Sequence, residues 1–185
     1  MIQKEKREPI RCPYRKMARR LLFGLALMLT PLHAKAAGLY LVGLGPGDPD
    51  LATVRAIKLV ERADIIYTMS PDIRERFASH LKGKDVRELS DQSISRYNAR
   101  KAKSRSGDAK DAAVLEGEKN RRSLIQEVRR FLGEGKQVVF VDSGDPLIYG
   151  PWVWMLQEFK DLDPEVVPGV SSFNAGLAAL KRDGT

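Results

Sequence analysis

A short apolar segment that runs directly into a glycine-rich turn, residues 38–49, constrains the fold of this chain more than any other feature. Residues 39–42 are apolar or aromatic, and such a run is long enough for a buried strand but too short for a helix. The turn carries three glycines separated by single residues, Gly43, Gly45 and Gly47. Because glycine has no Cβ atom, a ligand can approach the main chain there. The segment predicts a strand, a stiff turn and a helix that starts near Asp48 and Pro49, together a cradle for a small molecule.

The rest of the chain alternates between helical and strand patterns. We expect helices at 51–63, 72–81, 111–132, 152–159 and 173–181, and strands at 64–68, 86–89, 137–141 and 165–167. This alternation is typical of βαβ units, whose strands are parallel. The run 137–141 is apolar and rich in β-branched residues, which suits a central strand covered on both faces. We therefore predict an α/β fold with a mostly parallel five-stranded sheet and flanking helices.

A second glycine-containing turn, residues 143–150, follows the predicted central strand. In an open α/β sheet, ligands bind beyond the carboxyl ends of the strands. We expect this turn and the turn at 43–49 to lie on that edge together. A third turn, residues 168–172, ends the fifth strand.

The first turn does not match two common nucleotide-binding patterns. The dinucleotide pattern Gly-x-Gly-x-x-Gly would need a glycine where the chain has Asp48, and no Gly-Lys-Ser/Thr of a P-loop follows. An acidic residue at a helix start also competes with a phosphate for the helix dipole. A ligand with cationic and hydrogen-bonding groups fits better, and Asp48 and Asp145 could meet a positive group. For Asp48, helix capping is an equally good explanation.

The net charge of +8 is concentrated at the start of the chain. Residues 1–36 hold nine Lys/Arg and two Asp/Glu, whereas residues 37–185 hold 23 Lys/Arg and 22 Asp/Glu. The larger part therefore has no global charge that favours nucleic acid. A basic cluster at 96–105 is explained best as solvated surface. Its alternatives are a lid or patch that meets an acidic substrate and, less favoured because aromatic residues are few there, an RNA contact.

Residues 1–36 have the three parts of a secretory signal peptide. A basic segment, 1–20, precedes an apolar run, 21–32, and an Ala-Lys-Ala sequence ends at Ala36. The apolar run is shorter than the roughly 20 residues that a membrane-spanning helix needs. We predict export to the periplasm or beyond, with cleavage after Ala36. The alternatives are an uncleaved anchor and a cytoplasmic protein with a mis-assigned start, and Met17 is a candidate true start.

Cysteine and histidine are scarce. Cys12 is the single cysteine, and the two histidines are His33 and His80. Residues 37–185 therefore cannot form an internal disulfide, and they offer no Cys/His set with metal-ligand spacing. We assign no metal site.

Three motifs, each at a predicted strand end, resemble those of the tetrapyrrole (corrin/porphyrin) methylases. They are GLGPGDP at 43–49, SGDPLIYG at 143–150 and VPGVSS at 167–172. They stand in the family's order and spacing, and the resemblance covers about residues 38–182. It implies a first domain at 37–167, followed at 168–185 by a linker and the start of a second domain that is otherwise largely absent.

The resemblance implies a methyltransferase that uses S-adenosylmethionine to methylate a carbon of a porphyrin or corrin precursor, in a cobalamin or sirohaem pathway. In the family, the cofactor lies in the cleft between two α/β domains. Carried over by motif, the residues expected to contact it are Pro46, Ser143, Gly144, Asp145, Ile148, Ser171 and Ser172. Those of the second turn should do so largely through main-chain atoms. No catalytic residue is assigned.

One position departs from the family's pattern. Members that act on uroporphyrinogen carry an aspartate at the end of the second strand, proposed as a base, and this chain has Met69 there. A uroporphyrinogen substrate is therefore not indicated. The alternative function is a non-catalytic, exported module that binds a tetrapyrrole or the cofactor. The expected partner is a tetrapyrrole and not nucleic acid, membrane contact is expected only through an uncleaved leader, and a homodimer stays open.

Overall fold

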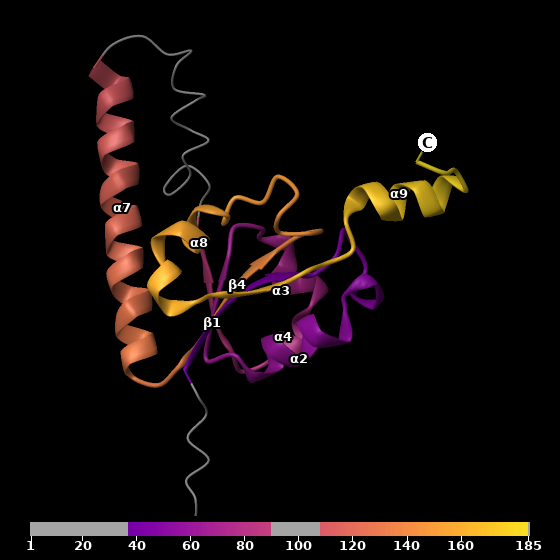
Figure 1. Ribbon diagram of the computed structural model, residues 1–185, viewed down its shortest axis with the longest axis horizontal. Helices are drawn as coiled ribbons and strands as arrows, with labels where there is room; N and C mark the ends of the chain where they lie inside the picture. The colour runs from indigo at the N-terminus through magenta and orange to yellow at the C-terminus, as the bar shows by residue number, and fades with distance from the viewer. Residues whose placement is uncertain (1–36, 90–107, 185) are drawn as a thin grey trace, which may run out of the picture. The chain divides into compact units, whose positions relative to one another are not determined.

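The computed structural model of the protein describes residues 37–89 and 108–184 (Figure 1). Two of the predicted features, the leader at 1–36 and the basic cluster at 96–105, lie outside these residues. In the described part of the chain, no helix combines the length and the apolar character that crossing a membrane requires.

Five strands form one sheet in the order β3-β2-β4-β1-β5, and every neighbouring pair is parallel. The strands are β1 (Gly38–Gly43), β2 (Ile65–Thr68), β3 (Asp85–Glu88), β4 (Gln137–Asp142) and β5 (Glu165–Val167). The predicted α/β fold is confirmed, and the sheet is wholly parallel. In the register between β1 and β4, Gly43 stands opposite Asp142, so both strands end at the same level. The turns that follow them therefore begin side by side.

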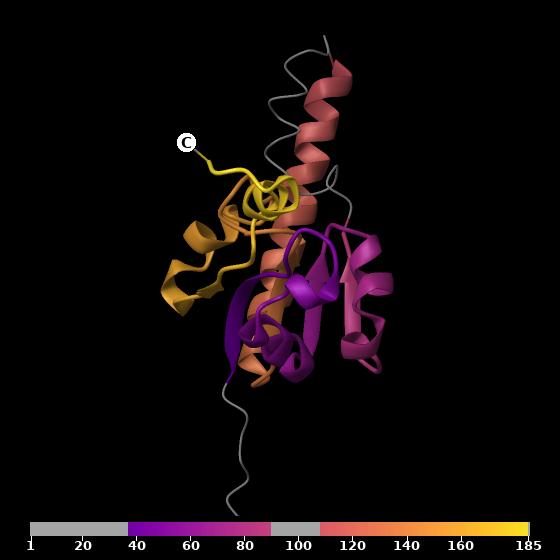
Figure 2. The same cartoon turned by 90° about the vertical axis from the view of Figure 1, so that its right-hand side faces the viewer.

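Helices cover both faces of the sheet (Figures 1 and 2). One face packs against α7 (Asp108–Gly133) and α8 (Trp154–Glu158), and the other against α2 (Val54–Arg62), α3 (Asp72–Arg76) and α4 (Ala78–Leu81). Residues of the central strand alternate between the two layers: Val138 and Phe140 face α7 and α8, whereas Val139 faces the other layer. This burial on both faces explains why β4 is apolar almost throughout.

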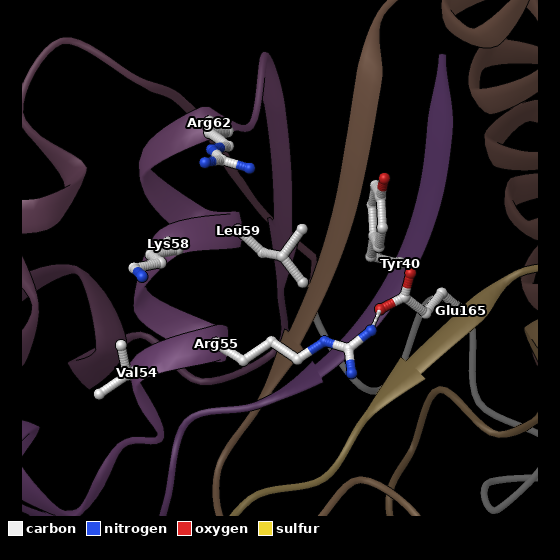
Figure 3. A pocket seen from close by; sticks show the side chains of 7 residues that line it. All are labelled: Tyr40, Val54, Arg55, Lys58, Leu59, Arg62 and Glu165. Atoms are coloured by element: carbon white, nitrogen blue, oxygen red, sulfur yellow. Dashed lines mark hydrogen bonds and ion pairs between the residues drawn. The ribbon is translucent and has the colours of Figure 1, made fainter. Parts of the chain in front are cut away.

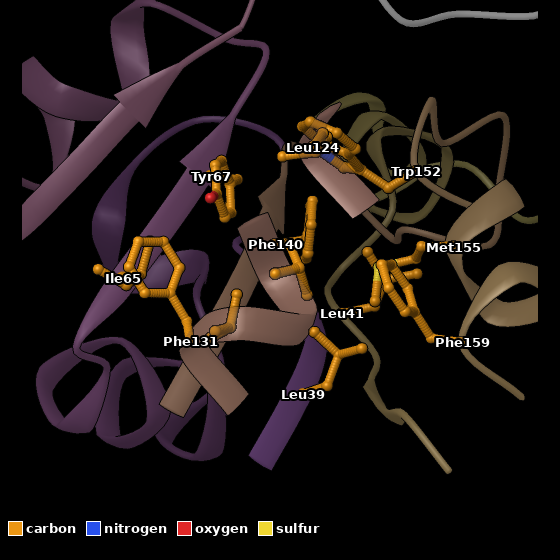
Figure 4. Close-up of a cluster of buried hydrophobic side chains, with 12 residues drawn as sticks. Leu39, Leu41, Ile65, Tyr67, Leu124, Phe131, Phe140, Trp152, Met155 and Phe159 are labelled. Carbon is orange, nitrogen blue, oxygen red and sulfur yellow. The ribbon is translucent and has the colours of Figure 1, made fainter. Parts of the chain in front are cut away.

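The core beneath α7 and α8 is organised around Phe140 (Figure 4). Its ring stacks on Tyr67 at a centroid distance of 4.9 Å and meets the edge of Trp152 at 4.8 Å. All three side chains are almost fully buried. The Trp152 indole Nε1 donates a hydrogen bond to the Val141 carbonyl oxygen at 3.1 Å. This hydrogen bond fixes Trp152, which follows the second glycine turn (143–150), to the end of β4.

The first helix begins later than predicted. Residues Pro49–Leu51 form a separate 3-10 turn, and α2 starts after Thr53, whose Oγ1 accepts a hydrogen bond from the Ala56 amide at 3.1 Å. Asp48 makes no side-chain capping bond. The prediction of a helix from residue 51 was wrong because Thr53 provides the side-chain cap, whereas Asp48 contributes only its main-chain carbonyl oxygen, which accepts from the Leu51 amide at 3.0 Å within the 3-10 turn.

Two other helices differ from expectation. The helix predicted at 72–81 divides into α3 and α4 at Phe77, which has φ −105° and ψ 24° and is fully buried. At the end of the chain, α9 (Ser172–Leu180) forms as predicted, but it contains no buried residue, and Leu180 is 71% exposed. The helical pattern of the sequence predicts burial of Ala175, Leu177, Ala178 and Leu180; this prediction was wrong, because the described residues cover these side chains only in part or not at all.

Candidate functional site

The turns that follow β1 and β4 are hydrogen-bonded to each other. The Gly144 amide donates to the Gly45 carbonyl oxygen at 2.8 Å, and the Gly45 amide donates back to Gly144 at 3.3 Å. Just before this pair, the Leu44 amide donates to the Asp142 carbonyl oxygen at 2.9 Å. Gly45 has φ +81° and Gly144 has φ +72°, a conformation that favours glycine. The two turns thus form one continuous piece of backbone beyond the sheet.

The third turn, which follows β5, touches the other two. A Cβ atom on Gly169 would lie 2.1 Å from the Gly144 carbonyl oxygen and 2.9 Å from that of Gly43. A Cβ atom on Gly43 would in turn lie 2.5 Å from the Gly144 oxygen and 2.7 Å from the Gly169 nitrogen. Three backbones from three strand ends therefore meet where only glycine fits. We refer to Gly43, Gly144 and Gly169 as the glycine junction.

The structure places all seven predicted contact residues on these three turns. Gly144 and Ser171 are buried, Pro46, Ser143 and Asp145 are half-buried, and Ile148 and Ser172 are exposed. Three of their side chains already have partners. The Asp145 Oδ1 accepts from the Leu147 amide at 2.9 Å, the Ser143 Oγ accepts from the Arg76 Nη2 at 3.2 Å, and the Ser171 Oγ caps α9 by accepting from the Asn174 amide at 3.2 Å. Contact by these residues would therefore come mainly from main-chain atoms.

The outer half of the second turn presents apolar surface. Leu147 and Ile148 are 55% and 54% exposed, and Tyr149 is fully exposed with φ +60°. Positive φ is uncommon for a residue with a side chain, and such residues gather at functional sites. The edge of the sheet therefore combines three closely packed glycine turns with an exposed apolar rim, and small-molecule sites are likewise lined largely by apolar side chains.

Asp142, the last residue of β4, is a buried acid that the sequence analysis did not single out. It is 8% exposed, its Oδ1 accepts from the Ser143 amide at 2.9 Å, and its Oδ2 is buried without a hydrogen-bond partner among the described residues. Gly150 packs against that oxygen so closely that a Cβ atom there would lie 2.8 Å from it. Burial raises the pKa of Asp142 to about 7. The signal in the sequence was an acidic residue at the end of an otherwise apolar strand.

Arg76 is a second residue that the sequence analysis missed. From the end of α3, its Nη1 donates to the Gly47 carbonyl oxygen, and its Nη2 donates to the Ser143 Oγ at 3.2 Å. A cation thus contacts the first and the second turn. Nothing in the sequence pattern distinguishes Arg76 from the other arginines of this segment, because only the tertiary fold brings α3 to the turns.

A separate hollow of about 490 Å³ lies where β1 and β5 begin, beside α2 (Figure 3). It is lined by Tyr40 near the start of β1, by Glu165 at the start of β5 and by side chains of α2. Arg55 reaches across it to pair with Glu165. None of the predicted contact residues borders this hollow, so we locate the candidate site at the glycine junction, where the three turns meet.

The residues at the junction fit S-adenosylmethionine better than they fit a metal ion. Among the described residues, no group of three or more His, Cys, Asp or Glu side chains is placed to hold a metal. The exposed apolar rim of Leu147, Ile148 and Tyr149 suits a ligand with a group that must be kept from water. No basic phosphate-binding pattern follows the first turn, which suits a ligand that carries no phosphate.

The parallel sheet with helices on both faces places the chain among the α/β proteins, which bind ligands beyond the carboxyl ends of their strands, where these three turns meet. A family model narrows this class: the chain belongs to the Tetrapyrrole (Corrin/Porphyrin) Methylases, whose model matches residues 38–185. All three glycine turns lie within the matched segment.

Curated relatives agree with this family. The chain is 30% identical over 143 residues to a cobalt-precorrin-4 C(11)-methyltransferase of Methanocaldococcus jannaschii, which covers 76% of this chain and 45% of the relative. It is 33% identical to the enzyme of the same name from Priestia megaterium, over 78% of this chain and 47% of the relative. A siroheme synthase of Azotobacter vinelandii is 31% identical over 82% of this chain and 32% of its own length. The chain thus spans less than half of these relatives.

Solved structures support the fold. A cobalt precorrin-4 methyltransferase superposes with a TM-score of 0.57 at 28% sequence identity, over 85% of this chain and 55% of that one. A putative cobalamin synthesis related protein from Corynebacterium diphtheriae gives a TM-score of 0.58 at 16% identity, over 81% of this chain and 60% of the other. The second similarity speaks for the fold alone.

Proposed function

We propose that the glycine junction is one wall of an S-adenosylmethionine site and that the protein takes part in methylating a carbon of a tetrapyrrole. The observation that carries this proposal is the close contact of Gly43, Gly144 and Gly169, which brings three motifs of the family together at one place beyond the sheet. The family membership supports the reaction class, and the relatives' names support the substrate class.

The chain's own residues would hold and orient the cofactor. Main-chain groups of the first and second turns would bind it, with Pro46 against it and Ile148 helping to exclude water. Ser171 and Ser172 would complete this side of the site. When bound, S-adenosylmethionine supplies an electrophilic methyl group for a nucleophilic ring carbon. Alignment of the two reactants supplies much of the rate in such a transfer, so a nucleophilic side chain is not needed.

We further propose a precursor of the cobalamin type as the substrate, with sirohaem precursors as the alternative. Two of the relatives are named cobalt-precorrin-4 methyltransferases, which supports this order. Met69 supports it too: where uroporphyrinogen-type members carry an aspartate, Met69 packs against the apolar core beneath α7 and α8. Its thioether offers no base.

The location of the protein stays a prediction. Export with cleavage after Ala36 depends on residues 1–36, which lie outside the described residues. The comparisons do not favour the non-catalytic, exported module, and the methyltransferase is the function we propose.

Calorimetric titration of the chain with S-adenosylhomocysteine tests the proposed cofactor site. We expect saturable binding with a dissociation constant below about 1 mM. Gly169→Ala should weaken binding about tenfold or more, because its Cβ would displace the Gly144 carbonyl. Gly133→Ala is the matched control, since a Cβ there meets nothing within 4 Å. Absence of binding by the parent chain at millimolar ligand would contradict the proposal.

A further inference from the structure

Arg76 links the first glycine turn, the second glycine turn and its own helix through one guanidinium group. Its Nη1 contacts the Gly47 carbonyl oxygen, and its Nη2 lies 3.2 Å from the Ser143 Oγ. The same Nη2 lies 2.9 Å from the Asp72 Oδ2, one helical turn earlier in α3. The side chain is 22% exposed, so these contacts are partly shielded from water.

The helix that carries Arg76 is fixed to the core. Ile73 and Phe77 are both fully buried in the cluster beneath α2, α3 and α4. The Phe77 ring centroid lies 5.8 Å from the Arg76 Cζ, so the guanidinium also rests near an aromatic side chain. Because the buried Ile73 and Phe77 lie on either side of Arg76 in the chain, the backbone at Arg76 is fixed relative to the core.

The chemistry of the contact requires an arginine. A guanidinium is a planar fork with two terminal nitrogens, whereas a lysine ammonium is a single point that cannot span two acceptors in the same way. The Arg76 Nε is buried and has no hydrogen-bond partner among the described residues. A buried donor without a partner is unfavourable. The contacts of Nη1 and Nη2 hold the guanidinium at the two turns although its Nε has no hydrogen-bond partner among the described residues.

We infer that Arg76 is a positioning residue that sets the separation of the turns at 43–49 and 143–150, and thereby the affinity of the site for S-adenosyl ligands. The claim that Arg76 sets the separation of the turns rests on the structure, whereas the claim that it affects affinity rests on the proposed function. Small displacements of groups that orient a ligand have large effects, so a shift of one turn would weaken binding without removing any ligand contact made by Arg76 itself.

The test compares Arg76→Lys and Arg76→Ala with the control Arg74→Ala. Arg74 lies in the same helix and also makes an ion pair, to the Glu88 Oε1 at 2.8 Å, and a main-chain contact, to the Val86 carbonyl at 2.7 Å, but it does not reach the turns. We expect S-adenosylhomocysteine to bind Arg76→Lys about tenfold more weakly than the parent, and Arg74→Ala within about threefold of it. Methylguanidinium in the buffer should restore part of the affinity of Arg76→Ala, which a general loss of stability would not allow.

Amide hydrogen exchange without ligand provides an independent measurement. The amides of Gly45 and Gly144 bond across the two turns, so they should exchange faster in Arg76→Lys than in the parent and in Arg74→Ala. Unchanged exchange in Arg76→Lys overturns the inference, whatever its affinity, and so does affinity within about threefold of the parent. If the parent does not bind S-adenosylhomocysteine at all, the proposed function fails, and the exchange rates alone decide whether Arg76 positions the turns.

Discussion

At the scale of single residues, Asp142 is the clearest case of a side chain held in an environment that disfavours its charge. In the part of the chain that the structure describes, the Oδ2 of Asp142 is buried without a hydrogen-bond partner, and burial raises the pKa of Asp142 from 3.8 to about 7. The folded protein therefore retains a proton that the unfolded chain has already released. The stability contributed by this proton is full below about pH 4, falls as the pH rises toward 7 and is absent above that range.

Asp142→Asn should remove this pH dependence. An asparagine has nearly the shape of the neutral acid but carries no charge, so the variant should gain stability relative to the parent as the pH rises from 4 to 8. A rise of the pKa from 3.8 to about 7 corresponds to an upper limit of roughly 4 kcal/mol in the free energy of unfolding. Urea unfolding at several pH values measures the difference, with the exposed Asp50→Asn as the control. A constant difference between Asp142→Asn and the parent across this range would rule the account out.

At the level of residues, the sequence marked those positions whose signal is local. Pro46, Ser143 and Ser171 were assigned from their motifs, and all of them lie on the turns that meet. Arg76 was missed because its role depends on a contact between segments far apart in the chain. Asp142 was missed because an acid at the end of a strand reveals its burial only when Gly150 is seen to cover it.

At the scale of elements, the beginning of α2 shows how two capping signals are resolved. Asp48 and Thr53 are both good capping residues, but only Thr53 makes the side-chain bond, to the Ala56 amide. Strand positions were easier to predict because an apolar run such as 137–141 has no competing explanation. Helix ends were harder, since the backbone leaves the helical conformation at Phe77 although the local sequence would continue the helix.

Thr53→Ala should lower the free energy of unfolding by about 1 kcal/mol, because the variant leaves the first amides of α2 without a side-chain acceptor. Asp48→Ala should have a much smaller effect, since Asp48 makes no capping bond. Urea denaturation of both variants measures this directly. Equal losses in the two variants would show that the helix begins at the glycine turn after all.

At the scale of the whole molecule, the strand order determines which turns lie next to one another. The sequence predicted parallel strands and a common carboxyl edge, but it did not contain the order β3-β2-β4-β1-β5. That order places β1 between β4 and β5 and so brings Gly43 between Gly144 and Gly169. The site is therefore a product of topology, built from residues that the motifs had already marked one by one.

The most direct test of the central claim is to locate S-adenosylhomocysteine on the protein by amide chemical-shift mapping. The account predicts that ligand shifts the amides of residues 43–47, 143–150 and 169–172, whereas the amides around the hollow lined by Arg55 and Lys58 stay in place. Shifts confined to that hollow, or none at saturating ligand, would contradict the claim that the glycine junction forms the cofactor site.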